Sequence, residues 1–70
     1  MDAKYEVVIW WSKEDDCYLA EVPELPGCMA DGESLTEAAA AIEEEIKLWI
    51  GVNRERGIAI PEPKGHLMYA

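Results

Sequence analysis

The stretch EVPELPGCMADGESLTEA, residues 21–38, restrains its backbone more tightly than any other part of the chain. Proline cannot donate a hydrogen bond to a strand ladder, so Pro23 predicts the end of a strand. The Pro-Gly dipeptide at 26–27 is typical of a tight turn. Ser34 and Glu37 match the S-x-x-E capping box, in which each side chain satisfies a backbone N–H at a helix start. The stretch therefore predicts a strand end, a turn, a short strand and the beginning of a helix.

A long helix is expected after this cap, from Leu35 to Arg56. Apolar residues recur there at three- and four-residue spacing, which produces one apolar stripe along a helix. The stripe consists of Leu35, Ala39, Ile42, Ile46 and Trp49. Gly57 fits the left-handed position that follows the last helical residue. At 1.5 Å per residue the helix would be about 33 Å long, so it dominates the architecture of so small a domain.

Three segments before the helix are expected to form an antiparallel sheet. Residues 4–12, KYEVVIWWS, are rich in β-branched and aromatic residues, and CYLAEV at 17–22 follows after a polar break of hairpin length. A short third strand is expected at 28–31, and the short connections favour a meander. HLMY at 66–69 is expected as an edge strand. The predicted fold class is α+β: a three-stranded antiparallel meander, one long helix packed on it, and a short C-terminal edge strand.

Adjacent tryptophans in the first strand must point to opposite faces of the sheet. Trp11 is expected to close the core between sheet and helix together with Trp49. Trp10 points to the other face, where no second helix of this chain remains to cover it. An exposed tryptophan is a typical anchor of a protein interface. The alternative is partial burial of Trp10 by the domain's own loops.

The charge of the chain limits the classes of partner. Fifteen acidic residues against six basic ones give a formal net charge of −9. Nucleic-acid binding needs Lys and Arg to replace counterions around phosphate, so direct binding to nucleic acid is not expected. An acidic surface steers basic partners toward the protein, or simply keeps it soluble. An apolar fraction of 50% with three tryptophans in so short a chain favours a homo-oligomer that completes its core across an interface.

No residue pattern indicates catalysis. Cys17 and Cys28 begin neighbouring strands and are expected to lie close in space as packed, reduced thiols, and two cysteines are too few for a four-ligand zinc site. The acidic run at 14–16 is interpreted as solvated turn residues, because divalent cations need oxygen ligands that converge from fixed positions. His66 is the only histidine, and no serine or cysteine lies in a nucleophile-elbow context. We therefore predict a protein without enzymatic activity, bound metal or cofactor.

The sequence carries no evident targeting signal. No basic segment followed by an apolar one occurs at the N-terminus. No apolar run approaches the roughly 18 residues that a membrane span requires. A single cytoplasmic domain covering residues 1–70, without membrane contact, is expected.

Taken together, these motifs resemble the HicB-like antitoxin family. The resemblance runs from about residue 5 to residue 63 through YEVVI, CYLAEVPELPGCMADGESLTEA, EEEIKLWI and GIAIPEP. It implies a partial ribonuclease H-like fold, β-β-β-α-β, assembled as a homodimer or tetramer. It also implies binding to a HicA-type toxin, a small basic ribonuclease whose active site the antitoxin blocks. Full-length HicB antitoxins usually carry a C-terminal DNA-binding segment; none is evident here, so operator binding is not expected.

The expected function is therefore inhibition of a basic, mRNA-cleaving HicA-type toxin by occlusion. The residues expected to bind the partner are exposed aromatic or acidic ones: Trp10, Glu14, Asp15, Asp16 and Glu24. One alternative is a degenerate ribonuclease H-like nuclease that binds Mg²⁺ through carboxylates on the strands, chiefly Glu6, Glu21 and Asp31. Another alternative is an oligomeric scaffold or small-ligand binder.

Overall fold

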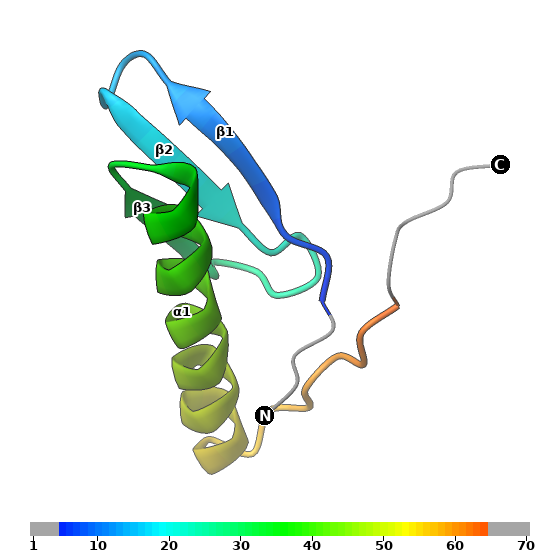
Figure 1. Ribbon diagram of the computed structural model, residues 1–70. Coiled ribbons are helices and arrows are strands. Elements are labelled where there is room, and N and C mark those ends of the chain that lie inside the picture. The colour runs from blue at the N-terminus through cyan, green and yellow to red at the C-terminus, as the bar shows by residue number, and fades with distance from the viewer. Residues whose placement is uncertain (1–4, 65–70) are drawn as a thin grey trace, which may run out of the picture.

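The computed structural model describes residues 5–64 and contains three strands followed by one helix (Figure 1). The elements are β1 Val8–Ser12, β2 Cys17–Glu21, β3 Met29–Gly32 and α1 Leu35–Glu55. Both strand pairs are antiparallel and the sheet order is β1-β2-β3. The predicted α+β meander with one long helix is thereby confirmed, whereas the edge strand expected at 66–69 lies outside the described residues.

The first strand is shorter than expected, because residues 5–7 do not join the ladder. Tyr5 instead buries its ring in the core, and its hydroxyl donates a hydrogen bond to the carbonyl of Pro61. The predicted bounds of the other elements agree with the structure to within one residue.

The passage from β3 into α1 is held by the predicted cap and by a close backbone contact. The N–H of Glu37 donates to the Ser34 hydroxyl at 3.1 Å. The Glu37 carboxylate accepts from the N–H of Glu33 at 2.8 Å, so the reciprocal bond of the capping box falls one residue before the cap. Gly32 lies so near the helix that a Cβ atom built there would be 2.4 Å from the backbone nitrogen of Ala38. The helix therefore begins directly against the strand that precedes it.

The end of α1 is a Schellman motif, as Gly57 predicts. Gly57 has a φ of 74°, in the left-handed region that glycine adopts without strain. Its N–H donates to the carbonyl of Arg54 at 3.1 Å, and the N–H of Ile58 donates to that of Asn53 at 2.9 Å. These two bonds satisfy carbonyl groups that would otherwise end the helix unpaired.

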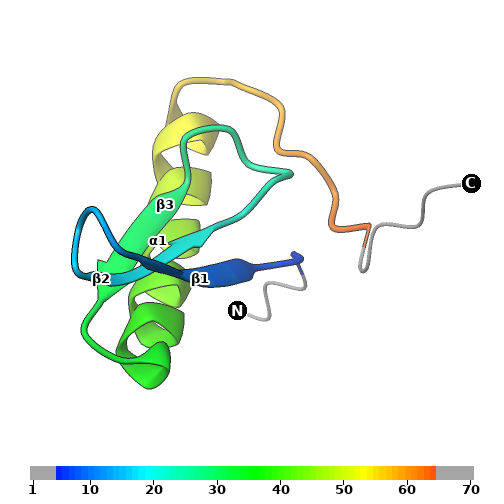
Figure 2. The same ribbon diagram turned by 90° about the horizontal axis from the view of Figure 1, so that it is seen from above.

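The core lies between α1 and one face of the sheet (Figure 2). Ile42 and Ile46 are buried as predicted, but the buried row continues to Ile50 and begins at Ala38. Leu35 is exposed, because it lies one turn before the contact between the helix and the end of β3. The complete set of buried residues is Tyr5, Ala20, Val22, Leu25, Cys28, Ala38, Ile42, Ile46 and Ile50.

The expectation that Trp11 closes the core is wrong. Helix α1 packs mainly on β3, less on β2 and least on β1, so it does not cover the far strand of the sheet. Trp11 is consequently 46% exposed and makes an edge-to-face contact with Tyr18, at 5.1 Å between ring centroids. Trp49 does pack against the core, and its indole N–H donates to the carbonyl of Pro26 at 2.9 Å.

The connection between β2 and β3 contributes a core residue of its own. The N–H of Val22 donates to the carbonyl of Cys28 at 3.1 Å, which closes the loop at its base. The N–H of Cys28 donates to the carbonyl of Leu25 at 3.0 Å across the predicted Pro26-Gly27 turn. Gly27 has a φ of 81°, as the third position of a type II turn requires. This turn places Leu25 in the core with none of its surface exposed.

After the helix, residues 58–64 return past the start of β1 without forming a strand (Figure 1). Ile60 packs against the core, and the backbone N–H of Lys64 donates to the Glu24 carboxylate at 3.1 Å. Burial raises the pKa of Tyr5, and the charges of Glu24 and Glu62 raise it further against the opposing effect of Arg54. The Tyr5 hydroxyl therefore remains protonated and can donate its hydrogen bond to the Pro61 carbonyl.

Candidate functional site

The candidate site is the face of the sheet that α1 does not cover. Residues paired directly across antiparallel strands point to the same face, and alternate pairs point to opposite faces. The pairs of Ala20 with Ile9 and with Ala30 belong to the helix side. The opposite side, which we call the open face, consists of Val8, Trp10, Ser12, Cys17, Leu19, Glu21, Met29 and Asp31.

The centre of the open face is apolar. Trp10 pairs with Leu19 across the first two strands and is 36% exposed, and Val8 and Met29 are exposed as well. Scattered apolar residues are normal on a protein surface, but here they come from all three strands and lie on one face. Such a patch is typical of a surface that binds another protein.

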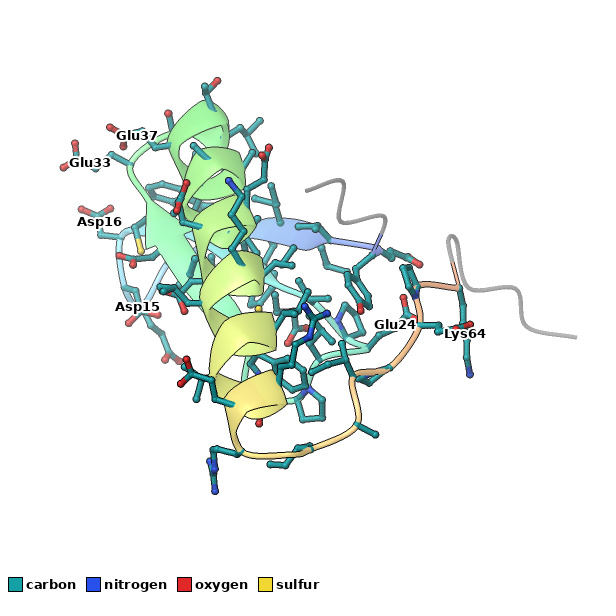
Figure 3. The ribbon with its side chains drawn as sticks, turned by 90° about the horizontal axis from the view of Figure 1, so that it is seen from below. Asp15, Asp16, Glu24, Glu33, Glu37 and Lys64 are labelled. Atoms are coloured by element: carbon teal, nitrogen blue, oxygen red, sulfur yellow. The ribbon has the colours of Figure 1, made fainter. Side chains whose placement is uncertain are left out.

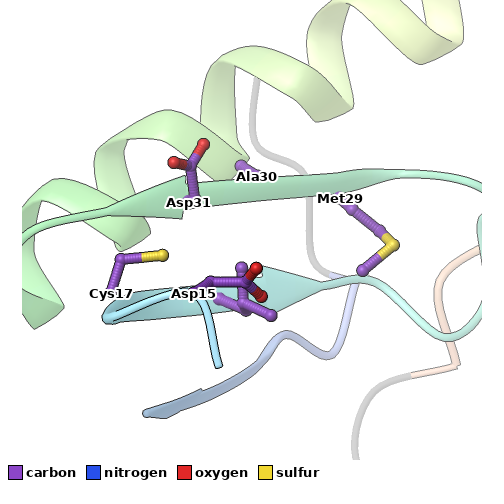
Figure 4. A pocket seen from close by; sticks show the side chains of 6 residues that line it. Asp15, Cys17, Met29, Ala30 and Asp31 are labelled. Carbon is purple, nitrogen blue, oxygen red and sulfur yellow. The ribbon is translucent and has the colours of Figure 1, made fainter. Parts of the chain in front are cut away.

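Carboxylates border this apolar centre. Glu21 pairs with Met29, and Asp31 pairs with Leu19, so both carboxylates stand beside exposed or half-buried apolar side chains. A hollow of about 520 Å³ opens between Asp31, Met29 and the hairpin turn (Figure 4). Its lining consists of Asp15, Cys17, Leu19, Met29, Ala30 and Asp31.

The turn between β1 and β2 holds its acidic residues in a defined conformation. The Ser12 hydroxyl donates to the Asp15 carboxylate at 3.0 Å, and the Asp15 N–H donates back to Ser12 Oγ at 3.2 Å. Asp16 has a φ of 54°, a left-handed conformation that aspartate tolerates better than most residues. The turn therefore keeps Asp15 beside the hollow at one end of the open face.

The expectation that the two cysteines lie close together is wrong. Cys17 pairs with Ser12 at one end of β2, whereas Cys28 adjoins Met29, which pairs with Glu21 at the other end. Because β2 and β3 are antiparallel, a cysteine at the start of β2 and a cysteine directly before β3 lie at opposite ends of the strand pair. Cys28 is buried in the core, and burial followed by the charge of Glu45 raises the pKa of its thiol.

The pKa of the Cys17 thiol responds to the negative charges around the open face. Burial raises the pKa of its thiol, and the negative charges of Asp31, Asp15 and Asp16 raise it further. Since only the thiolate attacks iodoacetamide, we expect Cys17 to be alkylated more slowly near neutral pH than an unperturbed thiol. Asp31→Asn should move the midpoint of the rate-against-pH profile to lower pH, measured by mass spectrometry of the labelled peptide. Glu43→Gln on the outer side of α1 is the control, and equal midpoints in the two variants would contradict this field.

The structure brings together four of the five residues predicted to bind a partner. Trp10 lies on the open face, Asp15 lines the hollow, and Glu14 and Asp16 belong to the same turn. Glu24 lies apart from them in the β2–β3 connection, beside Lys64 (Figure 3). A surface that includes Trp10 and the turn therefore does not include Glu24.

Four other members of the open face were not predicted to bind a partner, although the nuclease alternative named two of them, Glu21 and Asp31; the other two are Leu19 and Met29. The alternation of residues along β1 is enough to predict that Val8 and Trp10 share one face of the sheet. For β2 and β3, the residues that join this face follow from the pairing register, which only the folded structure provides.

The alternative of a metal-dependent nuclease finds no support in the grouping of the carboxylates. In the range 5–64, no three His, Cys, Asp or Glu side chains are grouped so that they could hold a metal ion. Glu21 and Asp31 share the open face, while Glu6 precedes β1.

The helix in this range is not long and apolar enough to cross a membrane.

A three-stranded antiparallel meander followed by one long helix places this domain in the α+β class. The chain belongs to the family described as HicB_like antitoxin of bacterial toxin-antitoxin system, whose profile matches residues 5–68. It is 38% identical to the UPF0150 protein Ta0767 of Thermoplasma acidophilum over 58 residues, which is 83% of each chain. It is 37% identical to a UPF0150 protein of Archaeoglobus fulgidus over 51 residues, or 73% of this chain and 72% of the relative.

A solved structure shares the fold. The crystal structure of TTHA0281 from Thermus thermophilus superposes with a TM-score of 0.74 at 25% sequence identity. The match covers 91% of this chain and 80% of TTHA0281. This likeness supports the order of three strands and one helix described above.

Proposed function

We propose that this protein is a cytoplasmic antitoxin that binds a basic, mRNA-cleaving HicA-type toxin and inhibits it by occlusion. The proposal includes assembly of the antitoxin as a homodimer or tetramer. Membership of the HicB-like antitoxin family carries the proposal. The acid-bordered open face supports it, because this face has the chemistry that a basic protein surface would complement.

The two parts of the open face have different roles in this proposal. Exposed apolar side chains around Trp10 supply affinity, since aromatic anchors dominate the binding energy of protein interfaces. Asp15, Glu21 and Asp31 steer a positively charged partner and raise its association rate. The same carboxylates would repel the open face of a second copy of this chain. The open face therefore fits a basic partner better than it fits another copy of itself.

An RNA-cleavage assay tests the function. The toxin to be tested is any short basic protein with a central histidine that a reading frame beside this gene is found to encode. Excess antitoxin is expected to abolish RNA cleavage by that protein, and the two are expected to elute together in size-exclusion chromatography. Continued cleavage at saturating antitoxin would overturn the proposal.

Replacement of Trp10 by alanine tests the contribution of the open face. Trp10→Ala is expected to weaken inhibition of the toxin about tenfold or more, because truncation of a central aromatic anchor typically costs at least about 1–2 kcal/mol. The measurement is the antitoxin concentration that halves the rate of RNA cleavage.

Trp11→Ala is the matched control for this variant. It removes the same side chain from the neighbouring position, which belongs to the helix side of the sheet. Circular dichroism should show both variants folded. If Trp11→Ala weakened inhibition as much as Trp10→Ala, the open face would not be the binding surface.

A further inference from the structure

The hollow at one end of the open face is lined by both apolar and acidic side chains. Leu19 and Met29 supply apolar surface from β2 and β3, and Asp15 and Asp31 supply carboxylates from the turn and from β3 (Figure 4). The hollow, of about 520 Å³, is open to solvent, so a side chain of another molecule can enter it. An occupant with an apolar stem and a positively charged end would match both parts of this lining.

The carboxylates around the hollow act on the same place. Burial raises the pKa of the Cys17 thiol, which lines the hollow, and the negative charges of Asp31, Asp15 and Asp16 raise it further. None of the described residues that line the hollow is basic, although Lys13 belongs to the adjoining turn. A cation that entered the hollow would therefore meet carboxylates whose charge no lining residue neutralises.

Arginine fits this lining better than lysine does. Its planar guanidinium presents five N–H donors in a fixed arrangement and can bond to more than one carboxylate, whereas a lysine ammonium is a compact and strongly hydrated charge. Because a guanidinium is more weakly hydrated, it loses less on approaching apolar neighbours such as Met29. The methylene stem of arginine also covers apolar surface while the charged end stays in contact with water.

The hollow adjoins the apolar centre of the open face. Trp10 pairs with Leu19, and Leu19 pairs with Asp31, so these three residues form one row across the sheet. Neighbouring strands lie about 4.8 Å apart, which places the backbones of Trp10 and Asp31 about 10 Å from each other. Seven residues of a helix rise by about the same distance. One short segment of a partner can therefore place an apolar side chain on Trp10 and an arginine in the hollow.

We propose that the hollow receives an arginine side chain of the protein bound on the open face, with the guanidinium bonded to the carboxylates of Asp15 and Asp31. The methylene stem of this arginine packs on the apolar part of the lining. The proposal rests on the proposed antitoxin function for its choice of partner and deepens it, because it assigns one kind of side chain to a partner so far described only as basic. Arginine and aromatic residues are the commonest anchors of protein interfaces, and this arrangement would place one of each side by side.

Small analogues of arginine test the hollow without a toxin. Nα-acetyl-arginine amide is titrated into the isotopically labelled full chain at constant ionic strength, and the backbone amide signals are followed by NMR. We expect saturable shifts at Cys17, Leu19 and Asp31. Nα-acetyl-citrulline amide has nearly the same shape without the charge, and Nα-acetyl-lysine amide has the charge without the planar guanidinium. Each of these two is expected to bind at least about threefold more weakly than the arginine amide.

Removal of one carboxylate locates the bound arginine. Asp31→Asn keeps the shape of the side chain and is expected to weaken binding of the arginine amide at least about threefold, because one charged acceptor is lost. Glu43→Gln removes the same charge from the outer side of α1 and should leave this binding unchanged. Circular dichroism should show both variants folded. Citrulline or lysine amide binding as tightly as arginine amide, equal affinity of the two variants, or shifts spread over the acidic residues of α1 would overturn the proposal.

The RNA-cleavage assay separates this proposal from the proposed function. Asp31→Asn is also expected to weaken inhibition of the toxin, whereas Glu43→Gln is not. Saturable binding of the arginine amide in the hollow, together with uninhibited RNA cleavage, would support the arginine site and overturn the antitoxin function. Full inhibition by Asp31→Asn, without any response of the wild-type chain to the arginine amide, would overturn the arginine site and leave the antitoxin function intact.

Discussion

Replacing Gly32 by alanine is expected to lower the free energy of unfolding by about 3 kcal/mol, the upper range for overpacking a tight interior. The new Cβ atom would lie 2.4 Å from the nitrogen and 2.9 Å from the Cα of Ala38, and 2.8 Å from the carbonyl carbon of Glu37. These are backbone atoms, which no side-chain rotation can move away. Either β3 or the first turn of α1 must shift, and both belong to the main packing contact of the domain. Urea unfolding followed by circular dichroism measures the loss.

Gly51→Ala is the control for this prediction, measured at a concentration where the protein is monomeric. It adds the same methyl group to a helical position with no neighbour within 4 Å. The free energy of unfolding should rise by about 0.5–1 kcal/mol, because alanine favours the helix. If the two variants had equal stability, the close approach of Gly32 to the helix would not constrain the fold.

Replacing Leu25 by alanine is expected to cost about 3 kcal/mol, as for other fully buried leucines. Leu25 lies in a connection between strands, where truncation of a side chain is ordinarily tolerated. Here the side chain is completely buried and its N–H and carbonyl both form the hydrogen bonds of the loop. The same urea experiment measures the effect, with the slope against denaturant checked for a change in cooperativity.

Leu35→Ala provides the matched control for Leu25. It removes the same atoms from an exposed position at the start of α1. Its expected cost is below about 0.5 kcal/mol. A loss at position 25 as small as that at position 35 would mean that the β2–β3 connection does not belong to the core.

Local signals predicted the beginnings and ends of the elements well. Ser34 and Gly57 act through hydrogen bonds and backbone angles within a few residues, and each does in the structure what its type predicts. Glu37 also accepts a backbone N–H, but from Glu33 instead of Ser34. The Pro26-Gly27 turn is of the same kind. Such features depend on neighbours in sequence, so the sequence alone carries them.

Tertiary placement accounts for what the sequence did not predict. Both faces of β1 are partly apolar, and only the position of α1 over β3 decides that Trp11 stays largely uncovered. The burial of Leu25 depends on how a hydrogen-bonded loop folds back, and the separation of Cys17 from Cys28 depends on strand direction. For the candidate site, Trp10 could be predicted from strand alternation. Asp31 and Met29 could not, because their neighbours come from other strands.

The few contacts of residues 58–64 allow this segment to open locally while the sheet and the helix stay folded. These residues form no strand pair and no helical turn. Ile58 bonds the carbonyl of Asn53 at the end of the helix, and the residues after it attach through Ile60, the Tyr5–Pro61 hydrogen bond and the Lys64–Glu24 hydrogen bond. Their release regains about 1–2 kcal/mol of backbone entropy per residue while every ladder and helix bond stays closed. In hydrogen-exchange experiments we therefore expect this segment to open at lower free energy than the sheet and the helix. A partner that touched this end of the domain could therefore be accommodated by a local rearrangement, whereas a partner on the open face meets a rigid surface.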